Sequence, residues 1–242
     1  MLYLIGLGLN DEKDLSLNAI ETLKKCDKVC MEMYTNVWHG SMKKLEKLIG
    51  KKIIVLERGA VENNSILDEK SKKIALLIPG DPLSATTHVE LVMEARRRGV
   101  RISIVHSASI YTAIAETGLQ LYKFGRSTTL VTPRKNFNPS SPYEVIAENK
   151  KRGLHTLVLL DVNREEKRYM KIKDAIENMI KFSFDPGEKI IACCRLGSSR
   201  GVIKYGPMEK LMKDKELDAV PAAIIVPGEL NFKEEEALEL WK

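Results

Sequence analysis

The sequence predicts an α/β fold with two α/β domains and a cleft between them. Short apolar runs alternate with amphipathic stretches along the chain, which indicates a mainly parallel sheet with helices on both faces. This alternation changes after His106, where a stretch rich in turn residues follows. The length of 242 residues suits one large domain or two small ones. We therefore expect an N-terminal α/β domain of residues 1–110, with a mainly parallel sheet, and a C-terminal α/β domain of residues 111–242.

The first domain is expected to contain strands wherever a short run is rich in aliphatic residues. These runs are residues 2–5, 29–33, 53–56, 74–78 and 102–105. Amphipathic spacing predicts helices between them. The expected helices are one with Leu17, Ile20 and Leu23 on one face, one that starts at a Ser41 cap and stops at Gly50, and one over 84–98 before Gly99.

The second domain is expected to begin with a helix over 107–118 and a loop-rich stretch that ends near Pro142. Ser141 is the predicted cap of the next helix, with Pro142 in its first turn and Glu144 completing a capping box. Gly153 is expected to end that helix. The remaining predicted elements are strands over 156–160, 189–195 and 222–226 and a helix over 170–181.

Composition and charge exclude several classes of protein. The 44% hydrophobic content is too high for a disordered chain, and no apolar run reaches the length of about 18 residues that spans a membrane. The apolar start of the chain is interpreted as a first strand rather than a secretion signal. The net charge of +6 is compatible with RNA or an acidic protein partner, but acidic residues lie among the basic clusters, which favours solvated helix faces.

The cysteines and histidines show no metal-ligand spacing. Cys26, Cys30, Cys193 and Cys194 form no Cys-x-x-Cys pair, so we expect buried thiols that act as small hydrophobic residues. Free thiols are typical of the reducing cytosol. The histidines are scattered along the chain, and the sequence therefore predicts no metal site.

Ligands of parallel sheets bind beyond the carboxyl ends of strands, so the loops that follow the strands are the candidate sites. The first has glycines at Gly6 and Gly8 but Asp11 where a dinucleotide fingerprint needs a third glycine. This pattern leaves a tight turn and a binding loop both open. No nucleophilic triad or carboxylate pair accompanies the loops, and no catalytic residue is predicted. Such a site suits group transfer from an activated cofactor.

Two further loops are stiff or rich in small residues. Pro79 and Pro82 restrict the loop that presents Asp81, which is suited either to a polar ligand or to the N-terminal dipole of a helix. The loop from Arg195 to Arg200 has small residues between two arginines, which suits either an anionic group or a plain turn.

Taken together, these loops resemble the diphthine synthase family. The Gly-Asp-Pro loop alone indicates only the wider tetrapyrrole-methylase-like superfamily. Its combination with Ala85-Thr86-Thr87-His88 and Leu121-Tyr122-Lys123-Phe124-Gly125 is specific to diphthine synthases. The resembling segments are residues 2–9, 79–88, 109–110, 118–125, 152–157, 160–161, 195–198 and 226–228, and they span nearly the whole chain.

The resemblance implies a tetrapyrrole-methylase-like fold with S-adenosyl-L-methionine in the cleft between the domains. It further implies methylation of the amino group of a 3-amino-3-carboxypropyl chain on a histidine of translation elongation factor 2, a step of diphthamide biosynthesis. A homodimer in the cytoplasm is expected, with no membrane and no direct nucleic acid among its partners.

The resemblance also assigns cofactor-binding residues, position by position. In the first domain these are Leu9 through its backbone, Asp81 and Ser84 in the Gly-Asp-Pro loop, and the pair Ser109 and Ile110. In the second domain Leu160 matches a backbone contact. Leu196 stands where many members have alanine, so only its main chain is transferred, and Ala222 stands where histidine is frequent, so no side-chain contact is expected there.

Three residues and three rival functions stay open. Arg195 is either a ligand for the acceptor's carboxylate or a partner of Asp or Glu, and His88 and Tyr111 are candidate bases that we interpret as structural. The rivals are a nicotinamide-dependent reductase, a basic RNA-binding or translation-associated module, and another methylase of the same superfamily that acts on a small macrocycle or RNA.

Overall fold

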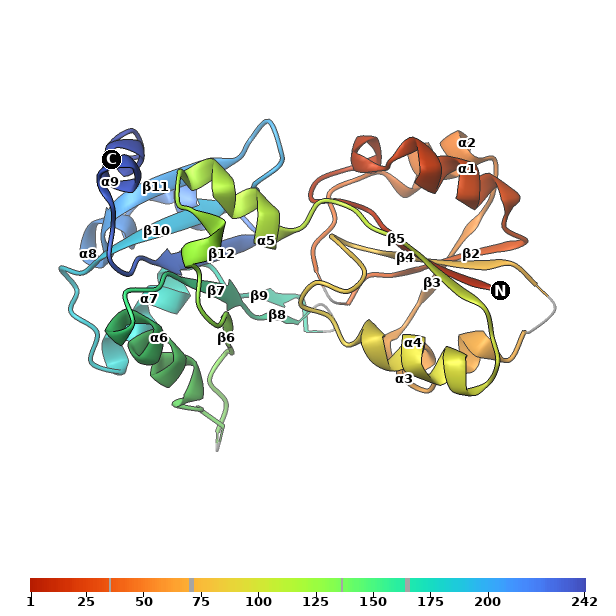
Figure 1. Cartoon of the computed structure of the whole chain (residues 1–242), viewed down its shortest axis with the longest axis horizontal. Helices are drawn as coiled ribbons and strands as arrows, with labels where there is room; N and C mark the ends of the chain where they lie inside the picture. Colours follow the sequence, from red (N-terminus) through yellow and green to blue (C-terminus); the bar gives the residue numbers. More distant parts are fainter. Residues whose placement is uncertain (35, 70–71, 136, 164–165) are drawn as a thin grey trace. The chain divides into compact units, whose positions relative to one another are not determined.

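The computed structural model consists of two compact units, Met1–Ile110 and Tyr111–Lys242 (Figure 1). It describes residues 1–34, 36–69, 72–135, 137–163 and 166–242. Each unit contains a five-stranded sheet with helices packed on it, which confirms the α/β class. None of the helices in these ranges is long and apolar enough to cross a membrane.

The sheet of the first unit is parallel throughout, with the strand order β3-β2-β4-β1-β5. Its strands are β1 (Leu2–Gly6), β2 (Lys28–Glu32), β3 (Ile53–Leu56), β4 (Ile74–Ile78) and β5 (Ile102–Val105). The five predicted strands are confirmed to within one residue at either end. β4 is buried over its whole length, because helices cover both faces of the sheet. The carboxyl ends of β4, β1 and β5 therefore lie side by side at one edge.

Helices cover the two faces of this sheet in pairs (Figure 1). They are α1 (Leu17–Lys25) and α2 (Met42–Ile49) on one face and α3 (Arg58–Glu62) and α4 (His88–Arg97) on the other, with 3-10 turns at Glu12–Asp14 and Ser65–Leu67. The predicted ends of α2 are confirmed: the Ser41 hydroxyl accepts the Lys44 N–H, and Gly50 has φ +70°. Leu23 and Leu45 belong to one apolar core, and Leu91 belongs to the other.

The third predicted helix of this unit starts later than expected. α4 begins at His88, whereas the amphipathic pattern placed its start at residue 84. Ala85 has φ +57°, a left-handed conformation that cannot continue a right-handed helix. The Asp81 carboxylate accepts the Leu83 N–H and closes a turn just before it. The predicted start was therefore wrong because a side-chain turn competes with the helix.

The sheet of the second unit is mixed, with the order β11-β10-β12-β7-β6. Its strands are β6 (Thr128–Leu130), β7 (Thr156–Leu160), β10 (Lys189–Cys194), β11 (Val202–Pro207) and β12 (Ala222–Val226), and a separate hairpin pairs β8 (Val162–Asn163) with β9 (Arg168–Tyr169). Only β6 and β7 are parallel among its paired strands. β10 ends one residue earlier than predicted because Arg195 has φ +52°. β6 and β11 were not predicted.

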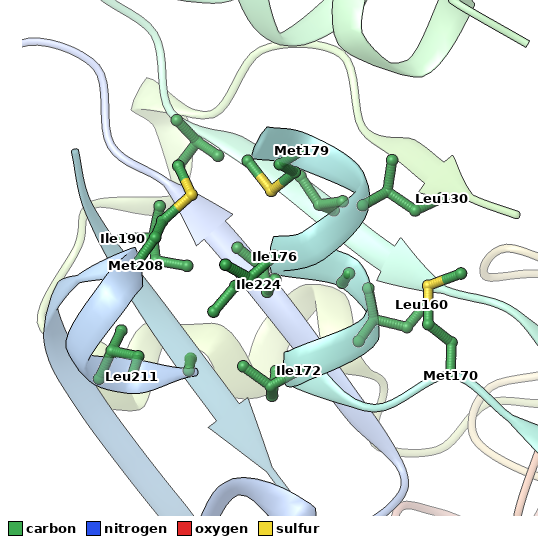
Figure 2. Close-up of a cluster of buried hydrophobic side chains, with 14 of the residues drawn as sticks. Leu130, Leu160, Met170, Ile172, Ile176, Met179, Ile190, Met208, Leu211 and Ile224 are labelled. Atoms are coloured by element: carbon green, nitrogen blue, oxygen red, sulfur yellow. The ribbon is translucent and has the colours of Figure 1, made fainter. Parts of the chain in front are cut away.

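The helices of the second unit enclose a core rich in isoleucine and methionine. They are α5 (Ile110–Ala113), α6 (Ser141–Lys151), α7 (Ile172–Lys181), α8 (Met208–Leu211) and α9 (Phe232–Glu239), with 3-10 turns at Ile114–Thr117, Leu121–Lys123 and Lys215–Asp218. Figure 2 shows Ile172, Ile176 and Met179 of α7 beside Ile224 of β12. α3, α8 and α9 were not predicted.

Three predicted helix starts in this unit were wrong. The helix expected over 107–118 begins at Ile110, because the Asp81 carboxylate accepts the Ser107 N–H and holds the preceding residues outside the helix. The helix expected over 170–181 begins at Ile172. The cap of α6 is Ser140 rather than Ser141, and the Ser140 hydroxyl donates to the Glu144 carboxylate instead of completing a capping box.

All cysteines are free and buried, as expected from the sequence. Burial raises the pKa of the Cys26 and Cys30 thiols, and it raises the pKa of Cys194 to about 12. The thiols therefore stay protonated at neutral pH and act as small hydrophobic groups.

Candidate functional site

The loops after β1 and β4 contact each other at the carboxyl edge of the first sheet. The Gly8 N–H donates to the Gly80 carbonyl at 3.2 Å, and the Gly80 N–H donates to the Gly8 carbonyl at 2.8 Å. A Cβ on Gly6 would lie 2.6 Å from the Gly80 oxygen and 2.6 Å from the Ser107 Cβ. Glycine is therefore required at residue 6 because three loops meet there with no room for a side chain.

The Asp81 carboxylate links the loop after β4 to the loop after β5. Its Oδ1 accepts the Leu83 N–H at 3.0 Å and the Ser84 hydroxyl at 3.2 Å. Its Oδ2 accepts the Ser107 N–H at 3.2 Å and lies 2.8 Å from His106 Nδ1. The two oxygens are thus already used within the protein, so the carboxylate fixes the relative position of the two loops.

The electrostatics of Asp81 agree with this role. The carboxyl is 7% exposed, and burial alone would raise its pKa. The Leu83 N–H, the His106 imidazole and the Ser107 N–H outweigh burial and hold the pKa of Asp81 below its ordinary value. The residue is therefore ionised at neutral pH. The sequence singled out Asp81, but nothing local indicated His106 or Ser107 as its partners.

The other expected contacts of the first unit lie at the same edge. The Leu9 N–H donates to Asp14 Oδ2 at 3.0 Å, and within the described ranges no hydrogen bond is made to the Leu9 carbonyl. Ser84 is half-buried, Ser109 is buried, and Ile110 opens α5. The structure therefore brings Leu9, Asp81, Ser84, Ser109 and Ile110 together on the loops that follow three adjacent strands.

The expected contacts of the second unit also share one sheet edge. Cys194 of β10 pairs with Ala222 of β12, and Ala223 pairs with Leu159 of β7. The end of β7 at Leu160, the start of β12 at Ala222 and the loop that carries Leu196 are therefore neighbours. Leu160 and Leu196 are buried and Ala222 is half-buried. These positions therefore present backbone groups, rather than long polar side chains, to a ligand.

Arg195, beside this edge, bonds to the backbone. Its N–H donates to the Pro221 carbonyl at 2.9 Å, and its Nε donates to the Val220 carbonyl at 3.2 Å. No ion pair between Arg195 and an acidic residue occurs in the described ranges. Of the two alternatives left open for Arg195, the pairing with Asp or Glu was therefore wrong, and the arginine instead fixes the loop between β10 and β12.

Two of the motifs that resemble diphthine synthases hold helix α9 in place. Glu234 of α9 is fully buried, forms an ion pair with Lys123 and lies 3.0 Å from His155 Nε2. The Gly228 N–H donates to His155 Nδ1 at 2.9 Å, so the imidazole is neutral and its proton is on Nε2. Lys123 and His155 lie in motifs that the sequence linked to function, and the structure gives them a structural role.

His88 and Tyr111, the candidate bases, have different surroundings. His88 is 2% exposed in the first turn of α4, and burial lowers its pKa to about 4. It is therefore neutral at physiological pH. The Tyr111 hydroxyl lies 2.6 Å from the Ser127 hydroxyl on the surface of the second unit. The Tyr111 hydroxyl therefore has a local partner that accounts for its position, whereas no such partner among the described residues accounts for the His88 ring.

Comparison with known proteins identifies the family. A family model for Tetrapyrrole (Corrin/Porphyrin) Methylases matches residues 1–211. A diphthine synthase of Methanocaldococcus jannaschii is 41% identical over 252 residues, which cover 99% of this chain and 98% of that protein. One from Methanococcus maripaludis strain C6 is 40% identical over 250 residues, with 99% and 98% coverage. The crystal structure of a diphthine synthase has a TM-score of 0.92 and 35% identity, and covers 99% of this chain and 95% of that chain.

These similarities extend over the whole chain and both units. They favour neither a nicotinamide-dependent reductase nor an RNA-binding module, and they confirm the resemblance found in the sequence motifs. The chain therefore belongs to the tetrapyrrole methylase family and, within it, to the diphthine synthases, which are methyltransferases.

Proposed function

We propose that this chain is an S-adenosyl-L-methionine-dependent methyltransferase of diphthamide biosynthesis. Its acceptor is the amino group of the 3-amino-3-carboxypropyl chain on a histidine of translation elongation factor 2. The full-length similarity to diphthine synthases at about 40% identity carries this proposal. No observation favours a macrocycle or an RNA as the acceptor instead.

The residues at the first sheet edge fit S-adenosyl-L-methionine. The Leu9 carbonyl, which accepts no hydrogen bond from the described residues, is suited to a donor group of the cofactor. A Cβ placed on Gly80 would meet no atom within 4 Å, so there is open space beside this loop. When bound, the cofactor supplies an electrophilic methyl group on a sulfonium. We propose Leu9, Asp81, Ser84, Ser109 and Ile110 as its binding residues here.

The second unit is proposed to contribute Leu160, Leu196 and Ala222 to the same cofactor. The support is that all three lie at one sheet edge and present backbone rather than charged groups. The expected contact of Leu196 through its main chain agrees with its buried side chain. The cleft predicted between the two domains stays a prediction.

The protein's task in this reaction is to align the acceptor and exclude water. A fixed arrangement of reacting groups provides effective molarities of about 10⁵–10⁸ M. The acceptor amine must be unprotonated when it attacks, and an α-amino group with a pKa of about 8 is partly unprotonated at neutral pH. No residue of the chain is therefore required to act as a strong base.

The test is mass spectrometry of purified elongation factor 2 that carries the 3-amino-3-carboxypropyl group. Incubation with the chain and S-adenosyl-L-methionine is expected to add mass in steps of one methyl group on the modified histidine. The number of steps gives the number of methyl groups transferred. A factor whose mass does not change would contradict the proposed substrate.

We further propose that the chain acts as a homodimer in the cytoplasm. Free, buried cysteines agree with a reducing compartment. Edge strand β3 exposes Ile54 and Val55 by 47% and 51%, which is apolar surface that a second copy can cover. Light scattering should give about twice the chain mass of 27.3 kDa, and a mass near 27.3 kDa would exclude the dimer.

A further inference from the structure

A cavity of about 240 Å³ lies in the first unit, apart from the glycine loops. Its walls come from the segments that follow β2, β3 and β4, on the face of the sheet that α3 and α4 cover (Figure 1). It is lined by Tyr34, Val61, Glu62, Asn64, Thr87, His88, Glu90 and Leu91. His88 lies on the chain segment that also carries Asp81 and Ser84, so one loop connects the cavity to the proposed cofactor residues.

Polar groups at this cavity lack partners. The Tyr34 hydroxyl and both ring nitrogens of His88 are buried without a hydrogen bond in the described part of the chain. The backbone of Pro82 raises the pKa of His88, but burial outweighs this effect and keeps the imidazole neutral. An unpartnered buried polar group costs about 1–3 kcal/mol. Three such atoms at one cavity indicate a ligand that supplies the missing partners.

The charges at the cavity favour a cation. Glu62 and Glu90 are both lining residues, and Glu32 is fully buried two residues before Tyr34. Burial, followed by the charges of Glu32 and Glu62, raises the pKa of Tyr34 to about 12, and Arg58 offsets this in part. The Arg58 guanidinium lies 5.7 Å from the centroid of the Tyr34 ring and pairs with Glu62. The ring of Tyr34 therefore already attracts one cation.

We propose that this cavity binds the amine-bearing side chain of the acceptor, with Tyr34 and His88 as its hydrogen-bond partners and Glu62 and Glu90 as its counter-charges. This inference rests on the proposed function and adds the residues that recognise the acceptor. Neutral His88 accepts a hydrogen bond from the amine through one ring nitrogen. The Tyr34 hydroxyl provides a second partner, and its ring attracts the positive charge of the protonated or methylated amine.

The Tyr34→Phe variant tests the inference without damage to the fold. The hydroxyl has no partner in the free protein, so its removal is expected to leave thermal stability unchanged or slightly higher. A structural role for Tyr34 would reside in its ring, which the variant keeps. Tyr122→Phe is the matched control because Tyr122 is 80% exposed. His88→Phe removes both ring nitrogens and retains an aromatic ring at that position.

The measurement is the affinity of the chain for elongation factor 2, determined by calorimetry in the absence of cofactor. Two forms of the factor are compared, one with and one without the 3-amino-3-carboxypropyl group. The wild-type chain is expected to bind the modified factor more tightly. Tyr34→Phe and His88→Phe should each reduce this preference about tenfold, as expected for a hydrogen bond to a charged group. The affinity for S-adenosyl-L-methionine should not change in either variant, nor the preference in Tyr122→Phe.

The outcomes separate this inference from the proposed function. A wild-type chain that methylates the factor while both cavity variants keep the full preference would overturn the inference and leave the function intact. A parallel loss of cofactor affinity in the variants would assign the cavity to the cofactor and also overturn it. The chain could also bind the modified factor more tightly, lose this preference in the Tyr34 and His88 variants, and yet transfer no methyl group. That result would contradict the proposed function and support the cavity as the binding site of the acceptor side chain.

Discussion

Asp81 shows how a residue that the sequence marks as a ligand can act first as a positioning group. Its four contacts use both oxygens, and they connect the loop after β4 with Ser107 and His106 after β5. The loops at the sheet edge are therefore fixed before any ligand arrives. A fixed loop loses little entropy on binding, which is the physical reason to place one carboxylate there.

We expect Asp81→Asn to weaken S-adenosyl-L-methionine binding at least tenfold. An amide cannot accept from all four donors, and its NH₂ group would face either the Leu83 or the Ser107 N–H, so one loop must move. Calorimetric titration measures the affinity. Asp185→Asn is the control, since among the described residues the Asp185 carboxylate accepts one hydrogen bond, from the Gly187 N–H in a turn of the second unit. Equal affinities of the wild type and Asp81→Asn would remove Asp81 from the site.

His88 makes the stability of the chain depend on pH. Its pKa is about 4 in the folded state against an ordinary value of 6.5, so the unfolded chain takes up a proton that the folded chain does not. The free energy of unfolding is therefore expected to fall by about 2–3 kcal/mol through this group as the pH decreases from 6.5 to 4.

Urea unfolding of the wild type and His88→Phe across this pH range measures the contribution. The variant should lose about 2 kcal/mol less than the wild type on acidification. Val89→Ala serves as the control because Val89 is the next residue of the same helix, is half exposed and carries no titratable group, so its pH profile should match the wild type. Parallel profiles for His88→Phe and the wild type would show that the imidazole is not the source.

At the scale of loops and helices, close backbone approach at the first sheet edge is the feature that shapes the site. We expect Gly6→Ala to separate the loops after β4 and β5, because the new Cβ would lie 2.6 Å from Gly80 and Ser107 atoms. Cofactor affinity and melting temperature should both fall. Gly50→Ala also places alanine in an unfavourable conformation, at φ +70°, but with no atom within 4 Å of its Cβ.

Gly50→Ala is the control for Gly6→Ala. It is expected to lose about 1 kcal/mol of unfolding free energy, and its cofactor binding should not change. Differential scanning calorimetry and titration of both variants compare the two effects. If Gly6→Ala behaved like Gly50→Ala, crowding at the three loops would have no part in cofactor binding.

The attachment of α9 depends on one buried carboxylate. Burial alone would raise the pKa of the Glu234 carboxyl, but Lys123, the N–H groups of Asn231 and Gln120, and His155 lower it to about 2. Removal of one partner leaves a buried charge without compensation. Lys123→Met is expected to cost about 3 kcal/mol of unfolding free energy, measured in urea at neutral pH.

Lys233→Met in the same helix is the matched control, since Lys233 pairs with Glu236 on the surface. Surface pairs contribute between about 0 and 1 kcal/mol, so this variant should remain close to the wild type. A similar stability of the two variants would mean that Lys123 does not compensate the buried charge.

The elements that the sequence predicted well are those with a local signal. The strands of the first sheet were predictable because β4 and its neighbours are aliphatic along their whole length. β6 has only three residues, and most residues of β11 are partly exposed, so neither strand is a continuous aliphatic run that the sequence would reveal. The start of α4 was missed because the turn at Asp81 and the left-handed Ala85 are set by side-chain hydrogen bonding rather than by periodicity.

The candidate site was predictable only in part, for a related reason. The glycines and prolines around Asp81 constrain their own loop, so they could be recognised without the fold. His106, and the pairing of Tyr34 with His88 at one cavity, depend on residues that are distant in the sequence and become neighbours only in the parallel sheet. Glu234 had no signal at all, since it is the first of three consecutive glutamates in a helix that was not predicted.

Across the whole molecule, the excess of basic residues is available for a protein partner. The net charge is +6, while the proposed acceptor cavity carries acidic residues, so attraction over long range and recognition at the cavity involve different groups. Attraction between exposed charges decreases with salt because the Debye length falls from about 10 Å at 0.1 M to about 3 Å at 1 M.

We therefore expect kcat/KM for the modified elongation factor to fall about three- to tenfold between 0.05 and 0.5 M salt. Initial rates at several salt concentrations measure this, with the affinity for S-adenosyl-L-methionine followed in parallel as the control. A rate that is independent of salt would mean that the basic residues only solvate helix faces.

The ion cluster of Glu234 also bears on how the chain matures during synthesis. Lys123 and Glu234 are separated by 111 residues, whereas every strand of the first sheet lies before residue 111. As the ribosome makes the chain from its N-terminus, every strand of the first sheet is synthesised before Glu234. The second unit must hold Lys123 and His155 without their carboxylate until Glu234 has been synthesised, so the buried ion cluster closes after the whole first sheet has been made.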